Sequence, residues 1–245
     1  MDNVQSGILA PCPKLARYLS FSLQAGSRPA RAVKALSEFA DGESIVVGLG
    51  HPLVRVLGRD IAGLRVFPTQ FGSGLVLPSC SAALWCWLRG DDRGKLLHAG
   101  RKIIAAVSSA FSLDSVVDGF QYDSGRDLTG FVDGTENPKG RKASAAAIVR
   151  GEGAGLDGSS FVAVQQWIHD FRRFEAMAEG PGQRHRPASQ RQQRADWRAA
   201  LGPYQAHGSG KFLAGGVHFA ALDALDRREG RRFEFRRFRE ILRCL

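Results

Sequence analysis

The chain has 245 residues, of which 44% are apolar and 24% charged, a composition normal for a folded globular protein. No run of eighteen uncharged apolar residues occurs, so neither a transmembrane helix nor a membrane partner is expected. The first residues lack the basic and then apolar pattern of a secretory signal, which predicts a cytoplasmic location.

The positive charge is concentrated in the last quarter of the chain. The formal net charge is +10, but residues 1–178 hold 20 Lys and Arg against 17 Asp and Glu. Residues 179–245 hold 14 against 7, and 13 of these 14 bases are arginine. The charge therefore belongs to a tail and does not by itself predict a nucleic-acid-binding surface on a folded domain.

The four cysteines are scattered along the chain without C-x-x-C spacing: Cys12, Cys80, Cys86 and Cys244. This spacing argues against a zinc site, a c-type haem attachment and a disulfide framework. Buried free thiols are the simpler prediction.

The first half of the chain alternates strands and helices. Residues 16–23 and 44–50 are short β-branched or alternating runs and predict strands. Residues 27–42, between them, have apolar residues at helical spacing. Residues 75–90 begin as a strand, and residues 90–111 predict a second helix. This strand–helix–strand–strand–helix–strand order predicts an α+β sandwich of ferredoxin-like type.

The second half starts a new sheet but does not complete it. SSFVAVQQWIHDF, residues 159–171, alternates with period two and predicts a strand, and FRRFEAMA could start a covering helix. Residues 179–245 contain one Val, one Ile and no sustained apolar period. We therefore expect a complete N-terminal domain at 7–125, a truncated second domain at 126–178, and a poorly ordered tail at 179–245.

Asp133 lies in an unusually glycine-rich stretch, GRDLTGFVDGTENPKG, at residues 125–140. Asp-Gly is a turn dipeptide, and an aspartate at a loop tip usually only caps the loop. The alternative is a carboxylate held in a site where glycines let the backbone approach a flat ligand closely.

This motif resembles that of the dye-decolorizing (DyP-type) peroxidases, which are b-type haem peroxidases built from two ferredoxin-like domains in a dimeric α+β barrel. The resemblance also includes GILAPCPKLARYLSFSL near the start, ALWCWLRGDDRGKLLHAGR at residues 83–101 and the strand at 159–171. It runs from about Gly7 to Met177 and contains the family's G-x-x-D-G pattern at Gly130–Gly134.

The resemblance implies haem b as cofactor, hydrogen peroxide and an organic reductant as partners, and a homo-oligomer. It implies that Asp133 is the distal acid/base, because peroxide heterolysis needs a group that moves a proton from one oxygen to the other. The implied cofactor-binding residues are Gly130, Phe131, Val132, Gly134, Thr135, Glu136 and Asn137. His169 is expected to be a hydrogen-bonded structural histidine, and Trp85, Trp87 and Trp167 core residues rather than electron relays.

In the family, the axial histidine and the distal arginine follow the strand at 159–171, in segments like SAHVKRT and ILRRSMPW. Neither segment is present here. An arginine-rich sequence with few Val, Ile and Lys is typical of GC-rich DNA translated in the wrong reading frame. Residues 182–187 can be written GGA CAA CGT CAT CGG CCG, which reads D-N-V-I-G-R one base later. We therefore predict a frameshift from about residue 179, which removes the axial histidine and leaves peroxidase activity absent or very weak.

Two other classes of function are consistent with the sequence. A nonspecific polyanion or nucleic-acid binder would use the arginine-rich tail and lose its salt-dependent affinity when residues 179–245 are deleted. A non-catalytic ferredoxin-like oligomerisation module would survive that deletion. No specific nucleic-acid partner is expected.

Overall fold

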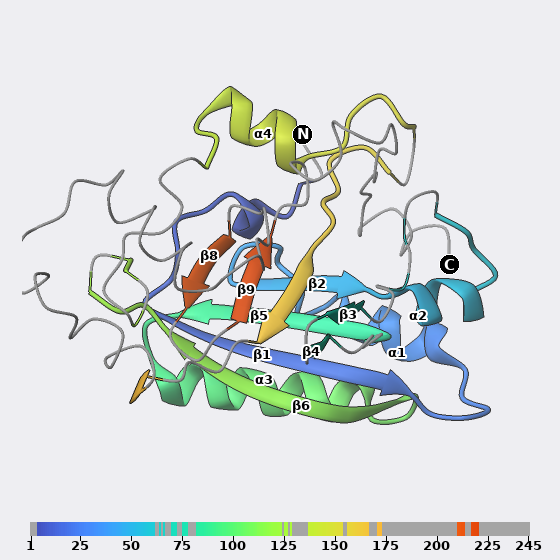
Figure 1. Ribbon diagram of the computed structural model, residues 1–245. Coiled ribbons are helices and arrows are strands. Elements are labelled where there is room, and N and C mark those ends of the chain that lie inside the picture. The colour runs from blue at the N-terminus through green and yellow to red at the C-terminus, as the bar shows by residue number, and fades with distance from the viewer. Residues whose placement is uncertain are drawn as a thin grey trace, which may run out of the picture.

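The structure is a computed structural model, shown in Figure 1. It describes residues 4–61, 64, 66, 70–72, 75–77, 82–123, 125, 126, 128, 137–153, 156–166, 171, 172, 210–213 and 217–220.

A four-stranded antiparallel sheet forms the centre of the first domain, with the strands in the order β2-β5-β1-β6. Two helices cover one face of this sheet (Figure 1). Along the chain the elements are β1 (Leu15–Leu23), α1 (Pro29–Leu36), β2 (Ile45–Leu49), β5 (Leu84–Gly90), α3 (Arg93–Val107) and β6 (Phe111–Phe120). The predicted ferredoxin-like arrangement is confirmed.

Three short elements were not predicted from the sequence: η1 (Ser6–Ile8), α2 (His51–Val56) and β3 (Gln70–Gly72). β3 forms an antiparallel hairpin with β4 (Leu75–Leu77), which is the strand predicted at the start of residues 75–90. The predicted run at 75–90 is divided into β4 and β5. Elements of three to six residues are too short for an apolar period to identify them.

The ends of the two covering helices follow from their sequences. Pro29 occupies the first turn of α1, where a missing N–H costs nothing. Asp92 precedes α3, and its carboxylate accepts a hydrogen bond of 2.9 Å from the backbone N–H of Lys95. Within α3, the glycine at position 100 lets the side chain of Arg17 from β1 lie close to the helix, since a Cβ at this position would lie 3.3 Å from the Arg17 Cδ.

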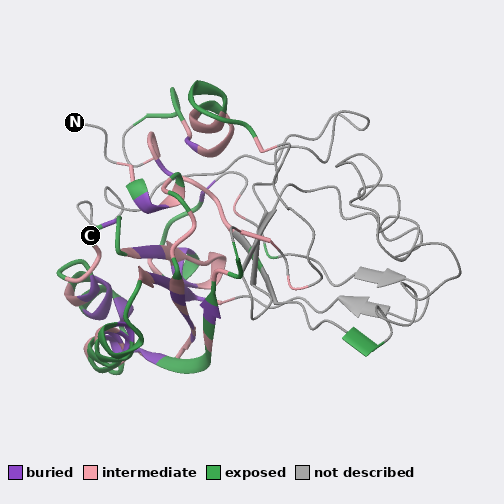
Figure 2. Ribbon diagram, turned by 90° about the vertical axis from the view of Figure 1, so that its left-hand side faces the viewer, coloured by how far each residue is buried: buried purple, intermediate pink, exposed green. Residues whose placement is uncertain are grey.

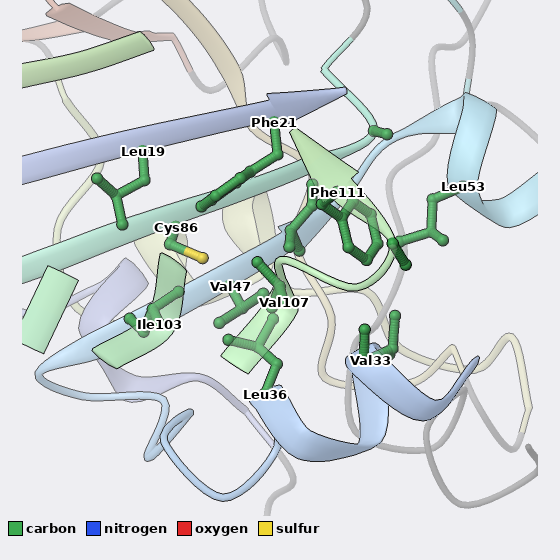
Figure 3. Close-up of a cluster of buried hydrophobic side chains, with 14 of the residues drawn as sticks. Leu19, Phe21, Val33, Leu36, Val47, Leu53, Cys86, Ile103, Val107 and Phe111 are labelled. Atoms are coloured by element: carbon green, nitrogen blue, oxygen red, sulfur yellow. The ribbon is translucent and has the colours of Figure 1, made fainter. Parts of the chain in front are cut away.

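The larger hydrophobic core lies between the sheet and its helices, and all its fully buried members fall between Leu19 and Phe111 (Figure 3). Each element contributes to it: Leu19, Phe21, Val33, Leu36, Val47, Leu53, Cys86, Ile103, Val107 and Phe111. Cys86 is a buried free thiol, as predicted, and burial raises its pKa. Cys12 is half-buried, and Cys80 and Cys244 lie outside the described residues.

The other face of the sheet carries a cluster of aromatic side chains. The Tyr18 ring stacks on Trp85 and Trp87, with ring centroids 6.1 and 6.2 Å apart. Both tryptophans are 7% exposed, so the prediction that they are core residues is confirmed; Trp167 lies outside the described residues. Burial raises the pKa of Tyr18. Val162, just before the second sheet, packs against this cluster.

The N-terminal segment covers the outer edge of β2. The Gln5 side-chain amide donates a hydrogen bond of 2.8 Å to the Val47 carbonyl, and its oxygen accepts one of 2.9 Å from the Val47 N–H. The backbone N–H of Gly7 donates to the Gly42 carbonyl at 2.8 Å. A Cβ at Gly7 would lie 2.5 Å from Val46 Cγ2, so only glycine fits here.

A second, three-stranded antiparallel sheet has the order β7-β9-β8. Only β7 (Ala163–Gln166) comes from the predicted strand, while β8 (Gly210–Leu213) and β9 (Val217–Ala220) come from the tail. The composition of the tail predicts no strand there, and in this respect the structure differs from the prediction. Phe212, Val217 and Phe219 have high β propensity and flank a glycine pair, which suffices for four-residue strands. In Figure 2 the buried residues gather in the first domain.

Candidate functional site

The chain approaches the Asp133 motif through a tight turn after β6. Tyr122 and Arg126 form an isolated antiparallel bridge, and the Arg126 Nε lies 3.0 Å from the Asp123 carboxylate. Asp123 has a φ of 46° and Gly125 a φ of 98°, in the left-handed region. Sequence reasoning missed this turn, although Asp-Ser-Gly at 123–125 is the polar, glycine-containing pattern of a turn.

On the far side of the motif, Gly140 reverses the chain with a φ of 55° just before α4 (Arg141–Ala147). Asn137 is the one predicted site residue that the structure describes. Its side-chain Oδ1 is buried and accepts no hydrogen bond within the described part of the chain. Such an acceptor is costly unless the completed site supplies a donor, so Asn137 fits a polar site at this end of the motif.

The other predicted site residues lie outside the described residues: Gly130, Phe131, Val132, Asp133, Gly134, Thr135 and Glu136. Their roles stay predictions.

After α4, a compact loop returns the chain to β7. The Val149 N–H donates to the Ser159 carbonyl at 3.0 Å, and the Gly158 N–H donates to the Val149 carbonyl at 2.8 Å. Ser159 is 5% exposed, and its hydroxyl donates to the Leu156 carbonyl at 2.8 Å. The motif is therefore followed by a segment fixed by its own backbone.

Histidines are the candidate iron ligands of the chain, and three of the six lie among the described residues. Among them, no group of three or more His, Cys, Asp and Glu side chains could hold a metal ion. His51 begins α2 and His98 lies on the exposed side of α3, both in the first domain. His218 lies in β9 and pairs with Gln165, while His169, His185 and His207 lie outside the described residues.

The helices of the described part are all too short or too polar to span a membrane.

A family model for the C-terminal region of Dyp-type peroxidases matches residues 124–181, which include the Asp133 motif. Dye-decolorizing peroxidases are similar in sequence, among them those of Rhodococcus erythropolis and Brevibacterium linens. That of Rhodococcus erythropolis is 30% identical over 190 residues, covering 72% of this chain and 56% of the relative. That of Brevibacterium linens is 32% identical over 185 residues, covering 70% of this chain and 50% of the relative. This chain therefore spans about half the length of the curated relatives it matches.

Solved structures of peroxidases are similar in fold. A Dyp-type peroxidase from Shewanella oneidensis has a TM-score of 0.61 and 28% identity, covering 69% of this chain and 59% of that chain. A variant of DypB from Rhodococcus jostii in complex with heme has a TM-score of 0.60 and 27% identity, covering 68% of this chain and 59% of that chain. An encapsulated DyP-type peroxidase from Mycobacterium smegmatis also has a TM-score of 0.60, with 26% identity.

Proposed function

This chain belongs to the DyP-type peroxidase family, and we propose that the activity to which its sequence is adapted is the hydrogen-peroxide-dependent oxidation of organic substrates. The observation that carries this proposal is the family-model match over residues 124–181, because it contains the whole Asp133 motif. Haem is the family's cofactor, and when bound it supplies the redox chemistry.

Asp133 is the residue that we assign to proton transfer. Its carboxylate would take the proton from one oxygen of the peroxide and deliver it to the other. Gly130 and Gly134 would let the backbone lie close to the cofactor, and Asn137 would accept a hydrogen bond at the end of the loop. The residues Phe131, Val132, Thr135 and Glu136 complete the proposed cofactor-binding loop.

We infer further that residues from about 179 onward are translated out of the family's reading frame, which leaves this chain inactive or nearly so. The family-model match ends at residue 181, and the relatives named above match no more than 72% of this chain. Arginine makes up 13 of the 14 basic residues beyond 178. The family-model match therefore ends within a few residues of the point where the composition of the chain changes.

The alternative frame is strongly constrained, because the second base of each visible codon must be the first base of the hidden codon. Under this constraint DWRAALGPYQAHGSGKF, residues 196–212, can encode a phrase like GAPPSAHIKRTAQES. GGVHFAALDALD, residues 215–226, can encode EAFILRRSMPW. Both phrases resemble the family segments for the axial histidine and the distal arginine. The histidine codon would span Pro203 and Tyr204, so neither His207 nor the other tail histidines would be the ligand.

The decisive experiment compares the chain as translated with a version in which one base is removed near codon 181. Both are expressed, loaded with haem and tested for a Soret band and for peroxide-dependent dye oxidation. We expect both signals only in the restored version. Asp133→Asn in the restored version should keep the Soret band and lose roughly 10²–10⁴-fold in rate.

The outcomes separate the two proposals. Stop codons in the alternative frame, or a normal Soret band and turnover in the unaltered chain, would contradict the frameshift. A restored chain that binds haem but oxidises no dye would contradict the peroxidase assignment and leave the frameshift standing.

A non-catalytic ferredoxin-like module is the second candidate function. It is favoured by the larger core, whose buried members lie between Leu19 and Phe111 and need nothing from the tail. Deletion of residues 179–245 removes β8 and β9, but it should leave the secondary structure of the first domain and the association state of such a module unchanged. Loss of salt-dependent polyanion affinity on the same deletion would instead support a binding role for the tail.

We also propose a cytoplasmic location. The free, buried thiol of Cys86 fits a reducing compartment, where cysteines stay unpaired. Fractionation of cells that express the chain with its native start would test this.

A further inference from the structure

A groove lies in the first domain, where β1 begins, β6 ends and α3 makes its first turn. Its volume is about 340 Å³, at the lower end of the range for sites that bind small molecules. Both charged and apolar side chains line it, among them Leu15, Arg17, Arg93, Leu96, Asp118 and Phe120. We call this the Arg93 groove.

The floor of the Arg93 groove is built from two facing pairs of strand residues. Leu15 of β1 lies opposite Phe120 of β6, and Arg17 lies opposite Asp118. Residues two apart on a strand point to the same face of the sheet. This is the face that the helices cover, because a Cβ at Gly100 of α3 would lie 3.3 Å from the Arg17 Cδ. The floor therefore faces the wall that α3 provides.

The charges in the groove leave one guanidinium available to a ligand. Arg17 is balanced by Asp118, whose two carboxylate oxygens lie 3.0 and 3.1 Å from the Arg17 Nη1. Arg93 is exposed and makes no ion pair with any other residue that the structure describes. Asp91 and Asp92, which precede it, line a separate cavity beside β2 and β5. Two arginines and one aspartate give the Arg93 groove a net charge of +1, which favours an anion.

The apolar part of the lining distinguishes among possible anions. Phe120 is 44% exposed, and Leu15, opposite it, is half-buried. An inorganic anion at Arg93 would leave this apolar surface in contact with water. A ligand with an aromatic ring would cover it, and would add the offset or edge-to-face contact that aromatic rings make with phenylalanine.

We propose that the Arg93 groove binds a small planar aromatic carboxylate. The carboxylate pairs with the guanidinium of Arg93, whose planar fork of N–H donors matches the two carboxylate oxygens. The ring lies over Leu15 and Phe120. This inference is independent of the peroxidase assignment and of the frameshift, because the groove is lined only by residues between Leu15 and Phe120.

The test is a ligand-detected NMR titration of the full chain, as translated, with 2-naphthoate as the probe. A dissociation constant on the order of 1 mM is expected for a ligand of this size. Arg93→Gln should raise it at least about fivefold, since the charge-assisted hydrogen bonds are lost. Arg101→Gln is the matched control: it removes the same charge from an exposed position of α3 outside the groove, and should leave the constant unchanged. Phe120→Ala should raise the constant about threefold, through loss of the ring contact.

Two further probes separate the charge from the ring. The neutral amide 2-naphthamide keeps the rings, and acetate keeps the charge; each should bind at least about tenfold more weakly than 2-naphthoate. Protein-detected NMR locates the site, since 2-naphthoate should shift the backbone amide signal of Gly119 and not that of Val47 at the opposite edge of the sheet.

Four results would overturn the proposal. They are the absence of saturable 2-naphthoate binding, equal affinities of Arg93→Gln and Arg101→Gln, acetate or 2-naphthamide binding as tightly as 2-naphthoate, and an unshifted Gly119 signal at saturation. Each would leave the peroxidase assignment untouched, because no residue of the Asp133 motif lines the groove.

Discussion

Replacement of Gln5 tests how the N-terminal segment closes the first sheet. The Gln5 side-chain amide makes two hydrogen bonds to the backbone of Val47, of 2.8 and 2.9 Å, both partly buried. It thereby fills the place of one residue of a neighbouring strand. Gln5→Ala removes both hydrogen bonds, so that the N–H and C=O of Val47 either bind water or have no hydrogen-bonding partner.

The magnitude follows from these two contacts. A typical intramolecular hydrogen bond contributes about 0.5–1.5 kcal/mol net, so two contribute roughly 1–3 kcal/mol. Because water can reach a partly buried edge and replace part of these bonds, the expected loss of stability lies in the lower half of this range, about 1–2 kcal/mol. For a domain of about 100 residues each kcal/mol lowers Tm by roughly 4–8 °C.

Gln5→Glu separates the hydrogen-bonding role from the size of the side chain. At neutral pH the introduced carboxylate faces the Val47 carbonyl without a proton to donate, so the loss of stability should exceed that of Gln5→Ala. The folded state then favours the protonated form and raises the pKa of the introduced carboxyl group. The loss of stability of Gln5→Glu relative to the unaltered chain should therefore shrink as the pH falls toward 4.

The assay is thermal and urea unfolding followed by circular dichroism. Gln121→Ala is the control, because that side chain makes no hydrogen bond to a described residue. If both Gln5 variants unfold at the same temperature and urea concentration as the control at neutral pH, the interpretation that Gln5 caps the edge of β2 is refuted.

Three further substitutions test the first domain by the same unfolding assays. Gly50→Ala should destabilise by about 3 kcal/mol, because its Cβ would lie 1.7 Å from the Ala82 carbonyl oxygen; an unchanged urea midpoint would contradict this. Phe21→Ala should cost about 3–5 kcal/mol, since Phe21 is fully buried in the core, and a loss below about 1 kcal/mol would argue against that packing. Burial opposes ionisation of Asp41, but hydrogen bonds from the Ser44 hydroxyl and from backbone N–H groups outweigh it and lower its pKa. Asp41→Asn should therefore be less stable than the unaltered chain at pH 7, with a difference that disappears as the pH falls below the ordinary value of 3.8; a constant difference would contradict the sign.

The sequence predicted the long elements of the first domain because their patterns extend over several periods. The strand predicted at 16–23 is found at Leu15–Leu23, and the helix predicted within 90–111 at Arg93–Val107. The helix His51–Val56 was missed, since six residues hold fewer than two turns. The Gln5 cap could not have been predicted either, because it joins residues 42 positions apart through one side chain.

For the candidate site, the sequence identified the motif and the structure defined its two flanks. A glycine-rich loop with one carboxylate is a local signal, readable without knowledge of the fold. The buried acceptor of Asn137 is a tertiary property, since it depends on what packs over the loop. The left-handed turn at Asp123 also depends on conformation, although its residue types mark a turn.

The strands of the tail are compatible with the proposed change of reading frame. Codons with T in the second position encode Phe, Leu, Ile, Met and Val. Because the second base of a visible codon is the first base of a codon in the family's frame, each of these visible residues arises where the family's codon begins with T. Codons that begin with T encode Phe, Leu, Ser, Tyr, Cys and Trp, so short apolar runs can survive the frameshift while longer periods are lost. Strand pairing uses backbone groups and tolerates such substitution, which explains how Gly210–Leu213 and Val217–Ala220 can join β7. Binding an iron needs one particular side chain at one position, so under the proposed frameshift these strands would extend the sheet without restoring the site.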